Sequence, residues 1–193
     1  MVRRARNSAN ESDACMRAGH RLERGLVLFH VSEEADIGRF EPRSIDGSAA
    51  RLVWAIDDER LRNYLVPRDC PRVTYYADAS ASPADVERFI GTSTAVLAFE
   101  HAWLNRVRSA RLYCYELPPA GFELADACAG YFVSRTAVVP LSVRVVDDCM
   151  SELGRRGVEV RVLPDLWSLH DAVAASTLRH SMIRMRNAAP RIA

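Results

Sequence analysis

The sequence predicts an α+β fold, a single domain with a central, mostly antiparallel sheet flanked by helices. Its 193 residues fall within the usual length of one domain. Short apolar runs typical of strands follow one another through the middle of the chain, and helix start signals lie between and after them. Because no glycine-rich linker or internal repeat interrupts this pattern, we expect a disordered arginine-rich arm at 1–24, one domain at 25–188 and a frayed tail at 189–193.

The strands are predicted from compact or alternating apolar runs. They lie at 25–32, 51–56, 72–76, 95–99, 111–117, 131–134, 138–146 and 158–163. The residues around 95–99 also suit a helix that continues through 103–107. Further helices are predicted at 57–64, from Ser82 onward, at 148–156 and at 167–177. Asp57 is placed to cap the first of these, and Ser82 followed by Pro83 is a cap-then-proline start.

The charge balance and the hydrophobic pattern limit the kinds of partner that we expect the protein to bind. The 26 basic residues nearly balance the 25 acidic ones, so we expect no nucleic acid partner and no attraction to an anionic membrane. No apolar run reaches the ~18 residues that a membrane-spanning helix needs. The five cysteines form neither a disulfide framework nor a zinc-ribbon spacing, which predicts a reducing, cytoplasmic location. All basic side chains are arginines, so any anionic ligand would meet guanidinium groups.

The strong short motifs of common enzymes are absent from the sequence, and its dispersed histidines predict no metal site. What remains is a polar residue inside an apolar strand. His30 follows Val-Leu-Phe in the first predicted strand, and Ser32 lies two residues beyond it. A strand histidine is either a hydrogen-bonded core residue or, if it faces a cleft, a ribose contact or an acid–base group. The sequence leaves both interpretations open.

A second candidate is the loop 67–72, which has a proline at its first position and another at its fifth. Prolines restrict the backbone, so Arg68 and Arg72 are placed to clamp a phosphate or carboxylate. The alternative is that Arg68 and Asp69 form an internal network that braces the loop. Cys70 is a further candidate nucleophile, although the sequence identifies no adjacent base.

The segment 129–134 combines aromatic rings with a glycine that permits close backbone approach. Tyr131 is placed to stack on a flat heterocycle and Ser134 to contact a ligand, whereas Phe132 is expected in the core. Glu100 and Glu116 are the candidate carboxylates, each with a surface ion pair or solvation as the alternative.

Several segments together resemble a bacterial family of uncharacterised proteins defined only as a domain of unknown function. The most distinctive is the heptapeptide PRDCPRV at 67–73. The other segments lie at 28–33, 39–43, 53–57, 129–131 and 183–188.

A more distant resemblance is to the ADP-ribosyltransferase fold, in which an early strand carries a histidine much as 28–30 does here. This resemblance implies a split sheet, NAD as cofactor and a small nucleotide ligand as partner. It implies that His30 holds a ribose and that Tyr64 or Tyr131 stacks on nicotinamide. The late carboxylate of that fold has no clear match in this sequence, so the predicted catalytic residues are His30 together with Glu100 and Glu116, the two carboxylates selected from the strand pattern. Combined with the candidates taken from the residue pattern, the predicted cofactor contacts are His30, Ser32, Arg43, Tyr64, Arg68, Arg72, Tyr131 and Ser134.

Three functions remain open from the sequence. The first is an NAD-using, ADP-ribosyltransferase-like enzyme, for which His30, an arginine and an aromatic ring should converge. The second is a non-catalytic binding or interaction module, in which these residues are dispersed. The third is another hydrolase or transferase, in which His30 contacts Asp57 or Glu100.

Overall fold

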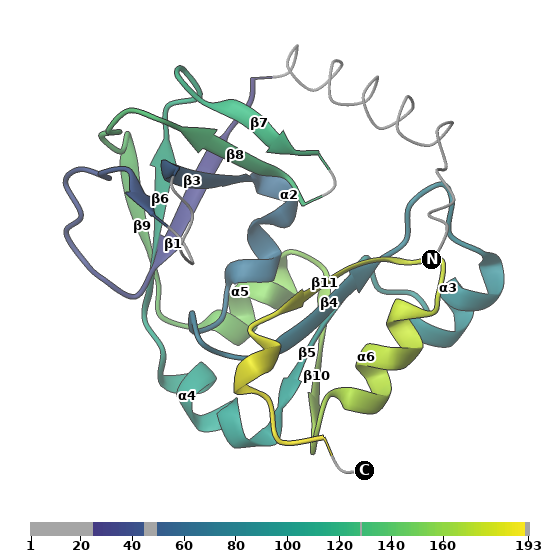
Figure 1. The fold of residues 1–193 in the computed structure, drawn as a ribbon. Helices are drawn as coiled ribbons and strands as arrows, with labels where there is room; N and C mark the ends of the chain where they lie inside the picture. The colour runs from purple at the N-terminus through teal and green to yellow at the C-terminus, as the bar shows by residue number, and fades with distance from the viewer. Residues whose placement is uncertain (1–24, 45–49, 128, 192–193) are drawn as a thin grey trace. The chain divides into compact units, whose positions relative to one another are not determined.

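The structure is a computed structural model that describes residues 25–44, 50–127 and 129–191. The predicted arm at 1–24 lies outside the described residues. The chain is an α+β domain with two mostly antiparallel sheets, which confirms the predicted fold class (Figure 1). Two compact units can be distinguished within it. No helix among the described residues is long and apolar enough to cross a membrane.

Among the described residues, the first unit comprises 25–30, 36–44, 50–60, 115–127 and 129–143. The larger sheet has the strand order β7-β8-β3-β1-β6-β9, with β2 paired to β3 (Figure 1). Its strands are β1 (Leu28–Ser32), β2 (Arg43–Ser44), β3 (Arg51–Asp57), β6 (Leu112–Leu117), β7 (Glu123–Asp126), β8 (Tyr131–Ser134) and β9 (Ser142–Val146). Strand β3 is central and pairs antiparallel with β1, β2 and β8. It therefore fixes which residues of β1 and β8 share a face.

The second unit comprises the described residues 31–35, 61–114 and 144–191. Its sheet has the order β10-β5-β4-β11, in which only the β10–β5 pair is parallel. The strands are β4 (Arg72–Tyr76), β5 (Ala95–Glu100), β10 (Val158–Leu163) and β11 (Arg179–Ile183). Strand β5 is buried at every position, as its continuous apolar run requires of a central strand.

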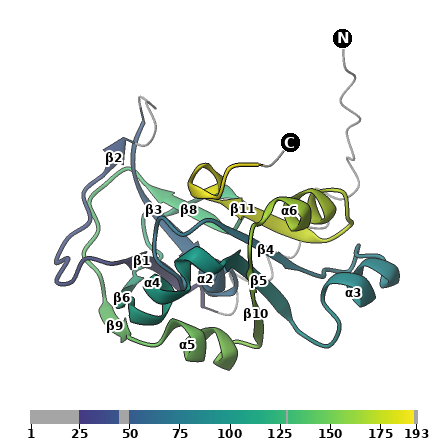
Figure 2. The same cartoon turned by 90° about the horizontal axis from the view of Figure 1, so that it is seen from below.

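Helices cover this smaller sheet. The helices of the second unit are α3 (Pro83–Phe89), α4 (Leu104–Ser109), α5 (Cys149–Arg155) and α6 (Trp167–Ala174), with 3-10 helices at Arg62–Tyr64, His101–Trp103 and Met185–Asn187. Helix α2 (Asp58–Leu61) directly follows β3 in the chain. Figure 2 shows α5 and α6 on opposite sides of the smaller sheet. Between α6 and the sheet, Tyr75, Phe89 and Val173 belong to one buried cluster. Ser82 caps α3 by accepting from the backbone N–H of Asp85, which confirms that predicted start.

Asp78, just after β4, is the most heavily bonded carboxylate near this sheet's edge. It accepts from the backbone N–H of Ser80 at 2.8 Å, from the Ser80 hydroxyl at 2.5 Å and from Arg179 Nε at 2.6 Å. Partial burial opposes ionisation, but these bonds outweigh it and lower the pKa of Asp78 from 3.8 to about 2. Its carboxylate thus favours the folded state wherever it is ionised.

We expect Asp78→Asn to be less stable than the wild type by about 2 kcal/mol at pH 6, from the size of this pKa shift. Because the folded-state pKa is depressed, the contribution is complete above pH 4 and is lost as the pH falls through 2. Urea unfolding of both proteins from pH 6 to pH 2 checks this. A gap between them that stays constant with pH would contradict it.

Candidate functional site

His30 is held in one orientation on β1. Its Nδ1 lies 2.9 Å from the backbone carbonyl oxygen of Trp54, and its ring packs on Phe40 with the centroids 4.8 Å apart. A carbonyl oxygen only accepts, so Nδ1 carries the proton and Nε2 is the acceptor of the neutral ring. The side chain is half-buried. The bond to Trp54 therefore fixes the tautomer of the neutral ring, with the proton on Nδ1 and the acceptor lone pair on Nε2.

The aromatic residue predicted to share this site lies on the other face of the sheet. Phe29 is opposite Ile56, and Ile56 is opposite Tyr131, so these three side chains share a face. His30 follows Phe29 directly and therefore projects from the opposite face. Tyr131 instead packs edge-on against Trp54, at 5.6 Å between centroids. The structure therefore does not bring Tyr131 together with His30.

Asp57 does share the sheet face of His30, since it is opposite Leu28 and Leu28 is two residues before His30. Its carboxylate caps α2, with Oδ1 accepting from the backbone N–H of Arg60 at 2.8 Å and Oδ2 lying 3.3 Å from Arg60 Nη1. The backbone carbonyl of Gly130 accepts from the N–H of Asp57 at 3.1 Å. The close approach predicted for Gly130 is thus made to the Asp57–Arg60 pair.

The remaining predicted residues of the larger sheet and its loops are engaged locally or exposed. Ser134 is buried, and its hydroxyl contacts the hydroxyl and backbone of Thr136. Glu116 accepts from the Ser142 hydroxyl at 3.1 Å. Arg43 is exposed on β2.

In the second unit, the loop 67–72 is braced from within by Arg72, which is only 2% exposed. Arg72 Nε donates to the carbonyl of Asn63 at 2.7 Å, and Nη1 donates to that of Cys70 at 2.8 Å. Longer contacts of 3.5 Å join Nη1 to the carbonyls of Pro67 and Arg68. The internal brace that the sequence allowed for this loop is therefore made by Arg72, through backbone carbonyls, and not by an Arg68–Asp69 pair.

Two other predicted residues lie close to this brace. The Arg72 guanidinium is 5.5 Å from the centroid of the Tyr64 ring, so the predicted stacking ring faces a cation of the same chain. Cys70 is buried, and burial raises the pKa of its thiol to about 12. Cys70 is therefore a protonated thiol at neutral pH and not an activated nucleophile.

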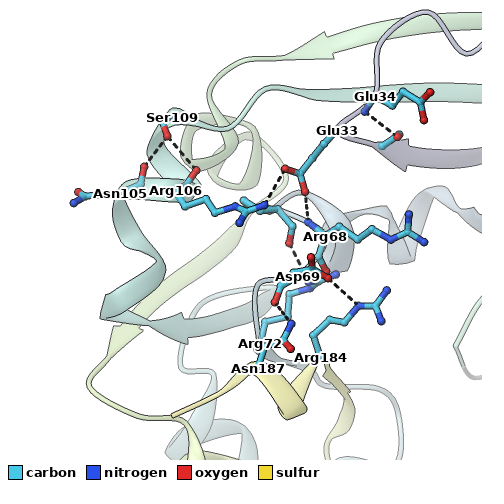
Figure 3. A network of polar contacts seen from close by, with 12 residues as sticks. Glu33, Glu34, Arg68, Asp69, Arg72, Asn105, Arg106, Ser109, Arg184 and Asn187 are labelled. Carbon is cyan, nitrogen blue, oxygen red and sulfur yellow. Dashed lines mark hydrogen bonds and ion pairs between the residues drawn. The ribbon is translucent and has the colours of Figure 1, made fainter.

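Arg68 differs from Arg72 in that its side chain points outward. Its backbone N–H donates to Glu33 Oε1 at 2.8 Å, and Glu33 Oε2 lies 3.5 Å from Arg106 Nη2 (Figure 3). Among the residues that the structure describes, none pairs with the Arg68 guanidinium, and the residue is exposed. Ser32, just before Glu33, accepts from the backbone N–H of Glu34 at 3.0 Å and so shapes this turn.

The same loop is joined to the end of the domain. Asn187 Nδ2 donates to the carbonyl of Asp69 at 2.7 Å, and Arg184 Nε lies 3.9 Å from Asp69 Oδ1 (Figure 3). Arg184 has a left-handed backbone, with φ of 55°. The candidate residues predicted from the sequence did not include Glu33, Arg184 or Asn187. The signal that could have found them is that all three lie in the shared family segments.

Glu100, predicted as catalytic, anchors the chain after Asn187. It is 2% exposed, and both carboxylate oxygens lie 3.0 Å from the backbone N of Ala189. The carbonyl of Ala189 accepts from Trp167 Nε1 at 2.7 Å. Farther along, Arg191 makes two bonds of 2.9 Å to Asp171. The described part of the segment predicted to fray, 189–191, is thus hydrogen-bonded.

A comparison with known protein families identifies the family to which this chain belongs. The sequence model of DUF6886, a family of unknown function, matches residues 29–188. The chain belongs to this family. No curated protein and no solved structure matches it. The DUF6886 match begins one residue before His30 and ends one residue before the Ala189 anchor, so it includes both His30 and the loop 67–72.

In this DUF6886 chain the predicted site residues therefore fall into separate groups. His30 and Asp57 share one face of the larger sheet, while Tyr131 lies on the other face. Arg68 and Ser32 belong to a polar network of the second unit, together with Glu33, Arg184 and Asn187. In the described residues, no group of three metal-ligating side chains is arranged to hold an ion.

Proposed function

We propose that the protein binds NAD through His30 and acts as an ADP-ribosyltransferase-like enzyme. The observation that carries this is the bond between His30 Nδ1 and the carbonyl of Trp54. With Nδ1 as donor, Nε2 can accept a hydrogen bond from a ribose hydroxyl, the role that the resemblance assigns to this histidine. Packing on Phe40 keeps the ring from turning, so little rotamer entropy is lost on binding.

Asp57, which the sequence suggested only as a partner of His30 in another hydrolase or transferase, fits this chemistry better than Glu100 and Glu116. When the glycosidic bond to nicotinamide breaks, its electron pair leaves with nicotinamide and positive charge develops on the ribose. An acceptor oxygen then bonds to that carbon and gives up a proton. A carboxylate on the face of His30 stabilises such charge, and Asp57 shares that face. All three carboxylates are hydrogen-bonded, Asp57 to Arg60, Glu100 to Ala189 and Glu116 to Ser142, so the shared sheet face is what favours Asp57.

The bond at Nδ1 also weighs against the hydrolase interpretation. A histidine that acts as a general base is commonly oriented by a carboxylate at its other nitrogen. Here a backbone carbonyl occupies that position on His30. The arrangement fixes the tautomer without supplying a negative charge, which suits a binding histidine better than a strong base.

The test is calorimetric titration of NAD into the wild type and into His30→Ala, with chromatography for released nicotinamide. We expect binding to weaken at least about tenfold in His30→Ala, the effect of losing one good hydrogen bond. His180→Ala is the matched control, because His180 also directs Nδ1 to a carbonyl, that of Leu178 at 3.1 Å, but is exposed on β11. Binding by His180→Ala should be unchanged.

The dispersal of Tyr131 away from His30 favours a second candidate, a non-catalytic binding module. The same titration separates the two. NAD binding without nicotinamide release would support the module with NAD as its ligand. No binding by the wild type at millimolar NAD would overturn the NAD proposal altogether.

A further inference from the structure

We propose that Arg68 and Arg184 form a binding site for a phosphate group, independent of the NAD proposal. Both arginines adjoin Asp69. Arg68 is its neighbour in sequence, and Arg184 Nε approaches its carboxylate at 3.9 Å, too far for a hydrogen bond. In Figure 3 both guanidinium groups extend beyond Asp69 toward the same side of the view. No described residue pairs with the Arg68 guanidinium, so its donors are available to a ligand.

The backbone beneath both arginines is held in place. Arg72 ties the loop 67–72 together through several carbonyls, and Glu33 accepts from the N–H of Arg68 itself. Asn187, three residues after Arg184, donates a hydrogen bond to the Asp69 carbonyl and so joins this segment to the loop. When a ligand binds these two arginines, only their side-chain rotamers have to become ordered, because the backbone is already fixed. The entropy cost of binding is therefore reduced.

The backbone of Arg184 supplies an independent indication. Its φ of 55° and ψ of 29° place it in the left-handed region, which strongly favours glycine or asparagine. The other described non-glycine residue with positive φ is Asp36, a type that tolerates this region. Strained backbone of this kind clusters at ligand-binding sites, which is consistent with a ligand contact by Arg184.

Charge at the site favours an anionic ligand. Arg106 is paired with Glu33, so those two charges offset each other. Arg68, Arg184 and Asp69 then leave one net positive charge, carried by two guanidinium groups. Guanidinium forks match phosphate oxygens through paired N–H donors. The site is therefore suited to a phosphate or pyrophosphate group, either as a free ion or as part of a nucleotide.

The probe is inorganic pyrophosphate, titrated by calorimetry at low ionic strength so that surface charges are not screened. The informative variant is Arg184→Gly, which removes the guanidinium and relieves the left-handed backbone. We expect pyrophosphate binding to weaken at least about tenfold while the melting temperature equals or exceeds that of the wild type. Arg68→Ala should weaken binding similarly. Arg108→Ala, an exposed arginine of α4, is the control and should bind as the wild type does.

Two further measurements test whether the phosphate belongs to NAD and whether the phosphate site is distinct from the site at His30. His30→Ala should leave pyrophosphate binding unchanged, whatever it does to NAD binding. Weaker NAD binding in Arg68→Ala would identify the phosphate as part of NAD, whereas unchanged NAD binding would identify a separate phosphate-bearing ligand. No pyrophosphate binding by the wild type, or binding equal in Arg184→Gly and the wild type, would overturn the proposal.

Discussion

Replacing Arg72 by alanine should lower the free energy of unfolding by roughly 3–5 kcal/mol, the range for breaking a buried, charge-assisted network. The guanidinium is nearly completely buried, with bonds of 2.7 and 2.8 Å to the carbonyls of Asn63 and Cys70. Alanine leaves those acceptors unsatisfied and opens a cavity at the first residue of β4. Urea unfolding, followed by circular dichroism, measures the loss.

Arg68→Ala is the matched control for this prediction, because it removes the same group from the same loop at an exposed position. We expect its stability to lie within about 0.5 kcal/mol of the wild type. Arg72→Lys should fall between the two, since lysine keeps the charge but cannot reach acceptors in different directions with a planar fork. Equal losses for Arg68→Ala and Arg72→Ala would show that Arg72 does not brace the loop.

The strands with clear apolar patterns could be predicted from the sequence, and the polar edge strands could not. The predicted strands 72–76, 131–134 and 158–163 match β4, β8 and β10 to the residue. The strands β2, β7 and β11 were missed. Every residue of β7 is exposed, and its sequence Glu-Leu-Ala-Asp has no apolar alternation. Strand β7 forms because its backbone pairs with that of β8. Its presence therefore depends on the neighbouring strand and cannot be recognised from its own residues.

The candidate site was predictable as a set of segments but not as a set of contacts. His30, the loop 67–72 and the segment 183–188 were all singled out from the sequence. The inward direction of Arg72 and the outward direction of Arg68 depend on where the loop meets β4. The separation of His30 from Tyr131 depends on strand register, because a shift of one residue in the pairing of β3 with β8 would reverse the face of Tyr131. Neither direction nor register is visible in a single sequence.

The second large effect is expected for Gly130→Ala, with a loss of roughly 2–4 kcal/mol in the free energy of unfolding. Gly130 has φ of 65°, which an alanine adopts only with strain. A Cβ there would also lie 2.8 Å from Arg60 Cδ and 2.8 Å from Asp57 Oδ2. The Asp57–Arg60 pair is itself almost fully buried, so neither side chain can move aside freely.

Gly121→Ala separates the two causes of this loss. Gly121 also has a left-handed backbone, with φ of 82°, but a Cβ added there meets nothing within 4 Å. It should lose only about 1 kcal/mol, the conformational part alone. The excess loss in Gly130→Ala measures the close contact with Asp57 and Arg60. Equal losses in the two variants would mean that the Asp57–Arg60 pair moves aside at little cost, in which case the carboxylate that shares the face of His30 is not rigidly placed for the proposed chemistry.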